Sequence, residues 1–244
     1  MGKTLDQLAS AVLRDVEVLE DSANTQALTD CKNYINERAN DIYRRRTWGE
    51  YVVLGSFAVP ASTYFIRPSD VVLDAGFPAG NGRAATLSEF TSVRKGDVPL
   101  IAEDQGAINL TLASLWTSTT EPFKYVNLGQ KGVRLLGYYS SETTLSFFGK
   151  AGFQDLTASE TWIMDEDGKA LIKGAAADMM KYHDRDDNRA NALYGEYEAE
   201  IAKLVDAAEV QRGNVKRLIP LFPHTDQYNR FQMDTTKTGA GNYW

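Results

Sequence analysis

The spacing of apolar residues changes twice along this chain, and this pattern limits the folds that are open to it. From Thr4 to about Trp48, and again from Gly168 to about residue 210, apolar residues recur every three or four positions, as in helices with one buried face. Residues 51–164 are instead rich in Val, Thr, Tyr and Phe and broken by Gly, Pro, Asn and Ser, which is typical of strands and turns. The sequence therefore predicts an α+β protein in which a β domain interrupts a set of helices.

Two helices are predicted before the β region. The first covers residues 4–20, where Thr4 is a candidate N-cap residue and Gln7, three positions later, completes a capping-box pattern. The second helix ends near three consecutive arginines. The apolar stripe of the first helix is Leu5, Leu8, Val12, Val16 and Leu19, and that of the second is Leu28, Cys31, Ile35, Ala39 and Ile42.

Two further helices are predicted after the β region. The polar run HDRDDN at 183–188 separates them, and Asp186 or Asp187 is expected to cap the second of the pair. Four amphipathic helices can bury their stripes against one another in a bundle, so the two ends of the β insertion are expected to lie close together. The apolar faces are Leu171, Ile172, Ala175, Ala176, Met179 and Met180, and then Ala190, Leu193, Tyr194, Tyr197, Ile201, Leu204, Val205 and Ala208.

The predicted β domain contains several segments in which apolar and polar residues alternate. They include INLTLASL at 108–115, residues 133–137 and TTLSFF at 143–148. Turn-like runs fall between such segments, namely PAGNGR at 78–83, RKGD at 94–97 and LGQKG at 128–132. This order favours a small antiparallel sandwich or barrel.

The predicted domains are therefore a helical bundle from residues 1–50 and 165–210, an inserted β domain at 51–164, and an extended C-terminal arm at 211–244. The arm has no sustained period, but it is too apolar for a solvated linker. It carries five Lys or Arg against two Asp, hence +3, whereas residues 1–210 carry 21 against 31, hence −10. Such an asymmetry favours an arm that lies against an acidic surface. Ordering the backbone of the arm costs about 1–2 kcal/mol per residue, and this total exceeds the free energy gained by burying its apolar side chains. We therefore expect the arm to be disordered in a free monomer.

Composition narrows the functional classes. A chain of 244 residues that is 43% hydrophobic can bury a sizeable core. Its net charge of −7 argues against a general nucleic-acid-binding surface, because phosphate contacts need clustered cations. Cys31 is the only cysteine, which excludes an intrachain disulfide and suits a reducing compartment. No apolar run approaches the roughly 20 residues of a membrane span, so we expect a soluble protein without a membrane partner.

Residues that could carry catalysis are sparse. GKT at 2–4 resembles the end of a phosphate-binding loop but lacks the upstream glycine and strand, which favours a helix start instead. Neither His183 nor His224 has a candidate nucleophile beside it in a strand-turn-helix setting. Carboxylates are abundant, and nothing in the sequence singles out a catalytic pair. We therefore expect no enzyme activity, no cofactor and no metal.

The end of the second predicted helix carries Arg44, Arg45 and Arg46, with Trp48 close behind. The helix dipole favours cations at a C-terminus by about 0.3–1 kcal/mol each, which accounts for one or two of the arginines. Arg and Trp are also the residue types that protein interfaces favour. We predict that Arg44, Arg45, Arg46 and Trp48 form an intersubunit interface, with a purely solvated face as the alternative.

The order of these segments is similar to that of a known family. The likeness rests on INERANDIYRRRTWGEY at 35–51, TYFIRPSDVVLDAG at 63–76, EPFKYVNLGQKGVRLLGYYSSETTLSFFGKAGFQDLT at 121–157 and LIKGAAADMMKYHDRDDNRANALYGEYEAEIAKL at 171–204. In these features, and over residues 1 to about 219, the chain resembles the head-to-tail adaptor (connector) proteins of tailed bacteriophages. One departure is Ile66-Arg67-Pro68, where the family more often has Leu-Pro.

This resemblance implies a structural virion protein of the neck between capsid and tail, assembled in the host cytoplasm. It implies a homo-oligomeric ring of twelve subunits whose bundles surround a DNA channel. The portal protein would lie above the ring and a tail, nozzle or terminator protein below it, with DNA passing through without sequence-specific binding. An acidic body suits such a conduit, because cationic walls would hold phosphate. The arm residues implied to contact the portal are Leu218, Ile219, Leu221, Phe222, Tyr228, Arg230, Phe231, Met233, Tyr243 and Trp244.

A second interpretation stays open. The β insertion could be a non-catalytic binding module that recognises a carbohydrate or a protein, with the helices as its stalk. Its candidate contacts are Tyr138, Tyr139, Phe147 and Phe148, although their alternation with other apolar residues favours packing in the core.

Overall fold

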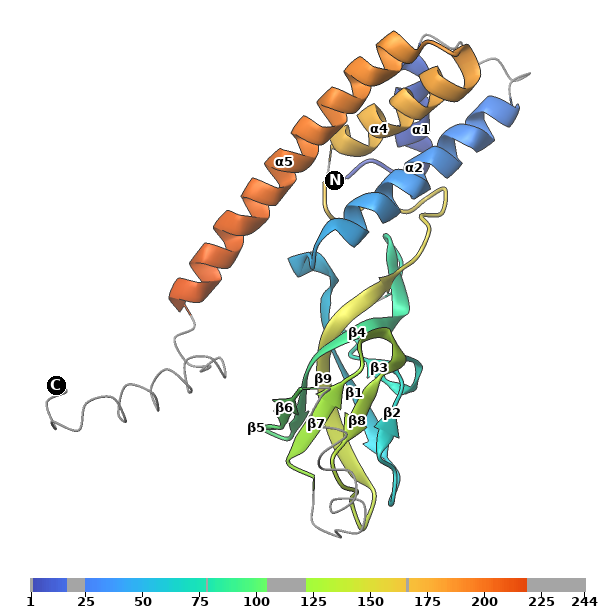
Figure 1. Ribbon diagram of the computed structural model, residues 1–244. Coiled ribbons are helices and arrows are strands. Elements are labelled where there is room, and N and C mark those ends of the chain that lie inside the picture. The colour runs from blue at the N-terminus through green and yellow to red at the C-terminus, as the bar shows by residue number, and fades with distance from the viewer. Residues whose placement is uncertain (1, 17–24, 78, 105–121, 166, 219–244) are drawn as a thin grey trace, which may run out of the picture. The chain divides into compact units, whose positions relative to one another are not determined.

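The computed structural model describes residues 2–16, 25–77, 79–104, 122–165 and 167–218 of the chain (Figure 1). Its contacts divide the chain into two compact units, Met1–Ala202 and Lys203–Trp244. The first unit contains helices from both ends of the sequence and two β-sheets between them. The predicted α+β class is therefore confirmed.

All four predicted helices are present. They are α1 (Leu5–Asp15), α2 (Thr25–Arg45), α4 (Lys169–Met179) and α5 (Asp187–Leu218), and a π-helical turn, Met180–Asp184, follows α4. The first helix was predicted to reach residue 20, but it ends at Asp15 in the described part, and residues 17–24 lie outside it. Helices at the two ends of the chain thus flank the β region in sequence, as the apolar spacing predicted.

The predicted helix starts are confirmed by their hydrogen bonds. The Gln7 backbone N–H donates to Thr4 Oγ1 at 3.3 Å, and the Thr4 N–H donates to Gln7 Oε1 at 3.0 Å, which completes the capping box of α1. The Arg189 N–H donates to Asp186 Oδ1 at 3.0 Å, so Asp186 is the capping residue of α5. The run GKT at 2–4 therefore starts a helix.

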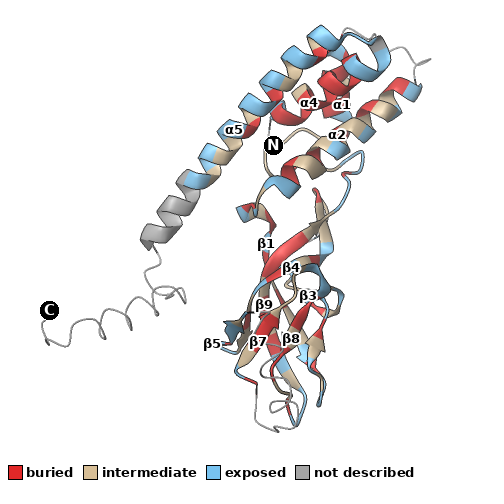
Figure 2. Ribbon diagram, in the orientation of Figure 1, coloured by how far each residue is buried: buried red, intermediate tan, exposed pale blue. Residues whose placement is uncertain are grey.

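Helices α1, α2 and α4 pack together and bury most of the predicted apolar stripes (Figure 2). Helix α4 is buried nearly all round rather than on one face, and its buried residues include Gly174, Ala177 and Asp178. A methyl group on Gly174 would come within 2.9 Å of the Tyr197 ring on α5 and 3.0 Å of the Arg38 side chain on α2. Small residues in α4 therefore allow its neighbours to approach on several sides.

The prediction that helical structure lapses near residue 211 was wrong, because α5 continues to Leu218. Residues 211–218 contain good helix formers and no proline, so the loss of an apolar stripe does not end the helix. The first strong helix breaker is Pro220, and helices usually end before the residue that precedes a proline. Leu218 is thus helical, and the rest of the predicted arm, residues 219–244, lies outside the described residues.

The β region forms two sheets. The five-stranded sheet has the order β3-β1-β9-β4-β5, and the four-stranded sheet has the order β2-β8-β7-β6. The strands of the first are β1 (Val52–Val59), β3 (Val72–Leu73), β4 (Arg83–Lys95), β5 (Val98–Pro99) and β9 (Thr143–Phe153), and those of the second are β2 (Phe65–Ile66), β6 (Ile101–Glu103), β7 (Lys124–Asn127) and β8 (Val133–Leu135).

One detail of the predicted β domain was wrong, because strands β6 and β7 pair in parallel. Of the two predicted alternatives, sandwich or barrel, the described strands do not form a closed barrel. A parallel pair needs a connection of a dozen or more residues, and residues 104–123 supply that length. The two sheets are also linked by a side chain, because Asn127 Nδ2 of β7 donates to Phe90 O of β4 at 2.6 Å. The predicted strand at 108–115 lies outside the described residues.

The two ends of the β insertion lie side by side. Strands β1 and β9 are antiparallel, and their register places Val52 opposite Lys150. This confirms the proximity expected of an insertion between helices. The same pairing brings β9 beneath the last turn of α2, where a group of polar side chains gathers.

Candidate functional site

Helix α2 is joined to the β region by buried aromatic residues. Trp48 is only 2% exposed, and its Nε1–H donates to Ile42 O at 2.8 Å. Tyr51 is fully buried, and its hydroxyl donates to Gly82 O at 3.1 Å. Trp48 was predicted to serve an intersubunit interface, but it packs inside its own chain and has almost no exposed surface left for a partner.

Lys150 of β9 reaches the C-terminal end of α2. Its Nζ donates to Tyr43 O at 2.9 Å and to Arg46 O at 3.1 Å, carbonyl groups that a helix end leaves without backbone partners. The ammonium also lies 3.8 Å from the centre of the Tyr43 ring, close enough for a cation–π contact. Burial lowers the pKa of Lys150, and the charge of Glu89 partly opposes this change. Lys150 therefore links β9, the last strand of the β region, to α2, the helix that comes before its first strand.

Tyr43 makes the same connection in the opposite direction. Its hydroxyl donates to Ala151 O at 2.9 Å and lies 2.9 Å from Ser88 Oγ. The sequence reasoning missed both Lys150 and Tyr43. The signal in the sequence was a lysine within the otherwise uncharged run LSFFGKAGF at 145–153.

The three arginines at this helix end have different surroundings. Arg45 forms ion pairs with Asp41 at 2.8 Å and with Glu198 of α5 at 2.6 Å, both within the same chain. The Arg46 guanidinium lies over the Trp48 ring at 5.2 Å from its centre. Arg44 is exposed and lines a pocket. The sequence analysis predicted one interface for the three, whereas the structure gives Arg45 ion pairs within its own chain.

The pKa values around Arg45 follow from these contacts. Burial alone would raise the pKa of Asp41, but hydrogen bonds from Tyr197, at 2.7 Å, and from Arg45 lower it below its usual value. The hydrogen bond from Arg45 also lowers the pKa of Glu198. Burial raises the pKa of Tyr197, and the neighbouring Asp41 charge adds to the effect. The cluster therefore holds α5 against α2 with two ionised carboxylates and a neutral phenol.

A second polar cluster lies among the helices. Asp178 of α4 is 2% exposed and accepts two hydrogen bonds from Arg38 of α2, at 2.6 and 2.5 Å. The Tyr194 hydroxyl of α5 donates to the same carboxylate at 2.6 Å. Burial opposes the charge of Arg38, but the bond to Asp178 outweighs it and raises the pKa of Arg38. The sequence carried one signal for this cluster, an acidic residue that directly follows three alanines near the end of an apolar helix.

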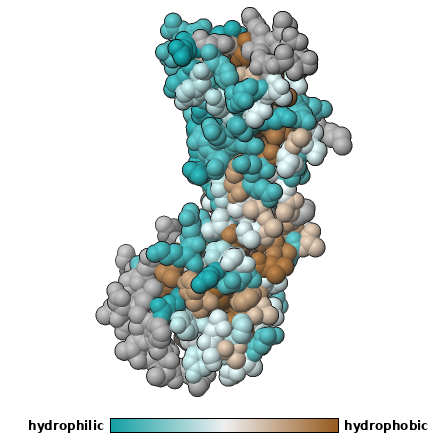
Figure 3. Space-filling model, turned by 90° about the vertical axis from the view of Figure 1, so that its right-hand side faces the viewer, coloured by the Kyte–Doolittle hydropathy of each residue, from teal (hydrophilic) through white to brown (hydrophobic). Residues whose placement is uncertain are grey.

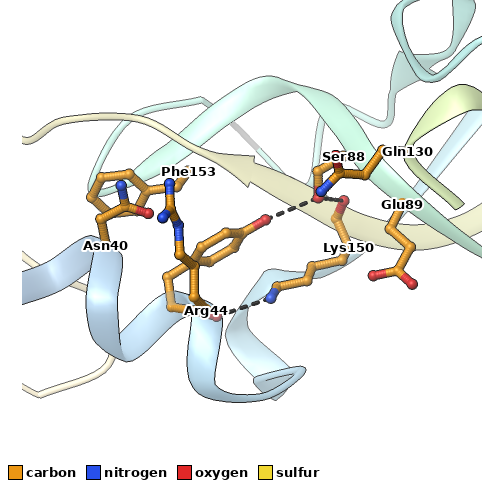
Figure 4. Close-up of a pocket in the computed structure, with 8 residues that line it drawn as sticks. Asn40, Arg44, Ser88, Glu89, Gln130, Lys150 and Phe153 are labelled. Atoms are coloured by element: carbon orange, nitrogen blue, oxygen red, sulfur yellow. Dashed lines mark hydrogen bonds between the residues drawn. The ribbon is translucent and has the colours of Figure 1, made fainter.

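An open pocket of about 430 Å³ lies beside the end of α2 (Figure 4). Most of its lining is polar, and Arg44 and Lys150 supply two cations. In Figure 4 the side chains of Arg44 and Glu89 lie on opposite sides of the Lys150 ammonium. The described residues that line the pocket are Asn40, Tyr43, Arg44, Ser88, Glu89, Gln130, Lys150 and Phe153.

The described residues contain no group of three His, Cys, Asp or Glu side chains that could hold a metal ion. His183 Nε2 lies 3.2 Å from Asp30 Oδ2, and His224 is outside the described residues. None of the described helices is long and apolar enough to cross a membrane.

The aromatic residues predicted as alternative binding contacts divide into two pairs. Tyr139 and Phe147 are buried, which confirms core packing for these two, whereas Tyr138 and Phe148 are half-buried. On the face shown in Figure 3, hydrophilic residues dominate the helical part and apolar residues gather mainly over the β part. The exposed large apolar residues of the described chain are Val52, Tyr64, Val72, Val98, Ile101, Phe123 and Tyr182.

Of the ten predicted arm residues, Leu218 ends helix α5 and the other nine lie outside the described residues. Their predicted contact with a portal protein stays a prediction. No model of a known protein family matches the chain, and no curated protein matches it significantly. The functional proposal therefore rests on the chain's own residues and geometry.

Proposed function

We propose that this chain is a structural virion protein, a head-to-tail adaptor subunit of a tailed bacteriophage. In this proposal the subunits form a ring that docks under the portal, joins it to the tail and forms part of the DNA channel. The observation that carries the proposal is the junction at the end of α2, where Lys150 and Tyr43 fix the β region to the helices through buried hydrogen bonds and Trp48 is buried against α2. A subunit that holds two neighbouring assemblies in register needs such a fixed connection.

We further propose that α1, α2, α4 and α5 close into one four-helix bundle. Support comes from the buried residues Ala190, Tyr197 and Ile201 on the first half of α5. The ion pair between Arg45 and Glu198 adds a link between α5 and α2. Polar links of this kind fix the position of a helix without requiring a wide apolar stripe.

The charge of the body supports a passive channel. Residues 1–210 carry a formal charge of −10, from 21 Lys or Arg and 31 Asp or Glu. A protein that neutralised many phosphates would hold DNA strongly, whereas a conduit has to let DNA slide. We propose that twelve copies form the ring, with a tail, nozzle or terminator protein as the lower partner, and that assembly occurs in the host cytoplasm.

Native mass spectrometry of the full chain, alone and mixed with the portal protein of the same virus, tests this proposal. We expect a high multiple of the 27.1 kDa subunit in at least one of the two samples. A variant that ends at Leu218 is expected to keep its helical circular dichroism but to lose portal binding. Wild-type chain that stays monomeric in both samples would exclude an adaptor ring.

A second candidate function has one observation in its favour. Val98, Ile101 and Phe123 of the β region are 68%, 47% and 58% exposed, and the Ile101 N–H donates to Phe123 O at 2.8 Å. Neighbouring exposed apolar residues mark binding surfaces in many proteins. The insertion would then be a non-catalytic module for a carbohydrate or a protein. Saturable binding on a glycan array that Phe123→Ser abolishes would favour this function over the ring.

A further inference from the structure

The pocket beside the end of α2 contains a cation whose partner is not among the described residues. Arg44 is exposed, and it makes no hydrogen bond or ion pair within the part of the chain that the structure describes. Its neighbour Arg45 differs, since Asp41 and Glu198 already occupy its guanidinium. Among the three consecutive arginines, Arg44 is therefore the one placed to bind an external group.

Lys150 is the second cation of the pocket, and its charge adds to that of Arg44. Lys150 is only 8% exposed and donates to two carbonyl oxygens, which accept two of its three N–H groups without neutralising its charge. A charge held in a largely buried position acts more strongly on a nearby ligand than one in bulk water. Glu89 is exposed and lies on the far side of Lys150 from Arg44 in Figure 4. The side of the pocket that Arg44 lines is thus left with an excess of positive charge.

The remaining lining indicates the chemistry of the ligand. Asn40 and Gln130 carry amide donors, whereas the Ser88 hydroxyl already bonds to Lys150 O. A planar carboxylate matches a guanidinium that offers two parallel N–H groups, and charge-assisted bonds of this kind are about twice as strong as neutral ones. A nucleic-acid phosphate fits less well, because Glu89 and the acidic surroundings would repel a chain of phosphates.

The net charge of the chain indicates which molecule would supply the carboxylate that Arg44 binds. Residues 1–210 contain 31 Asp and Glu, ten more than their Lys and Arg. Neighbouring copies in a ring would therefore present acidic surfaces to one another, and they need cationic contacts to associate. Resting on the ring assembly proposed above, we propose that the Arg44 pocket receives an Asp or Glu side chain from the adjacent copy of this chain.

A charge-removal experiment tests the role of Arg44 in assembly. Arg44→Gln is compared with Arg14→Gln, which removes another exposed arginine in the last turn of a helix. A charge-assisted hydrogen bond is worth about 1.5–3 kcal/mol, so Arg44→Gln should weaken subunit association about 10-fold to 100-fold, and Arg14→Gln less than about 3-fold. Mass photometry over a dilution series measures both, and thermal unfolding checks that the two variants fold equally well. Equal association of the two variants would overturn the proposal.

A cross-linking experiment identifies the partner group. In the assembled Arg44→Lys variant, a carbodiimide condenses the new amine with a carboxylate within reach, and a water molecule is lost. Rings mixed from ¹⁴N and ¹⁵N subunits show by peptide mass whether the linked acid belongs to another copy. A cross-link between isotopically different copies supports the proposal. A link only to Glu89 of the same chain, a link only to the portal protein, no link at all, or protection by added DNA would each overturn it.

The two proposals fail in different ways. If the wild-type chain forms rings but the Arg44 variants assemble normally, the pocket assignment is wrong and the adaptor function stands. If the wild-type chain forms no ring with or without the portal, the adaptor function itself is wrong, and the intercopy pocket falls with it.

Discussion

Replacing Asp178 by alanine should be among the most destabilising single changes in the helical part. The substitution removes a carboxylate that is 2% exposed and accepts hydrogen bonds from Arg38 and Tyr194. Breaking one side of a buried ion pair costs about 3–5 kcal/mol, because the other charge stays without its partner. Arg38 keeps 23% of its side chain exposed and lies over the Tyr194 ring, so water and the ring compensate in part. We therefore expect a loss of about 3–4 kcal/mol in the free energy of unfolding.

Thermal and urea unfolding of the full chain measure this loss. One kcal/mol shifts the midpoint of a domain of this size by about 2–4 °C, so Asp178→Ala should lower Tm by about 6–16 °C. Asp6→Ala is the matched control, because Asp6 forms a surface ion pair with Lys32 and its side chain is 55% exposed. A surface pair contributes about 0–1 kcal/mol, so the control should shift Tm by a few degrees at most.

A double-mutant cycle with Arg38→Met examines the coupling. The two single variants each leave an unpaired polar group, whereas the double variant leaves neither charge, so its loss should be smaller than the sum of the two. If Asp178→Ala costs no more than Asp6→Ala, the buried pair does not hold the helices together. The same follows if the losses of Asp178→Ala and Arg38→Met simply add in the double variant.

Three further predictions concern pH, backbone packing and thiol chemistry. Burial raises the pKa values of Tyr51 and Tyr197 above the usual 10.0, so the unfolded chain releases these protons first, and stability should fall as pH rises above that value. Urea unfolding followed across this range by tyrosinate absorbance checks the sign, and constant stability would refute it. Gly149→Ala should cost more than about 2 kcal/mol, because its Cβ would clash with the Glu89 backbone oxygen of β4, whereas Gly49→Ala meets nothing within 4 Å and should be nearly neutral. Urea unfolding of the two variants compares them directly. Burial raises the pKa of Cys31 to about 12, so its thiol should react with iodoacetamide only after unfolding, as mass spectrometry of the native and denatured chain would show.

The local elements could be predicted where local rules determine them. The capping box of Thr4 and Gln7 depends on residues three positions apart, and so does the Asp186 cap. Strand alternation likewise identified β8 and β9, because side chains of a strand point to opposite faces. The prediction for the end of α5 was wrong because it required an apolar stripe in every helical turn. The helix continues without such a stripe to Leu218, two residues before Pro220.

The polar clusters could not be predicted in the same way. Arg38 and Asp178 are separated by 140 residues in the sequence. The Lys150 ammonium donates to the carbonyl oxygen of Tyr43, which lies 107 residues away. Nothing in the sequence around any of these residues indicates its partner. The three consecutive arginines show the same limit, since they share one sequence neighbourhood and only the structure shows that Arg45 pairs with Asp41 and Glu198.

By itself, the sequence determined the class of this protein, the number and order of its predicted helices and the place of the β insertion, because these follow from apolar spacing over a few turns or strands. Only the tertiary structure decided which charges are paired within the chain, that Trp48 belongs to the core, and that β6 and β7 run parallel. The physical reason is distance along the chain: a capping bond or an apolar stripe involves near neighbours, whereas an ion pair or a strand pairing depends on where folding brings remote segments together.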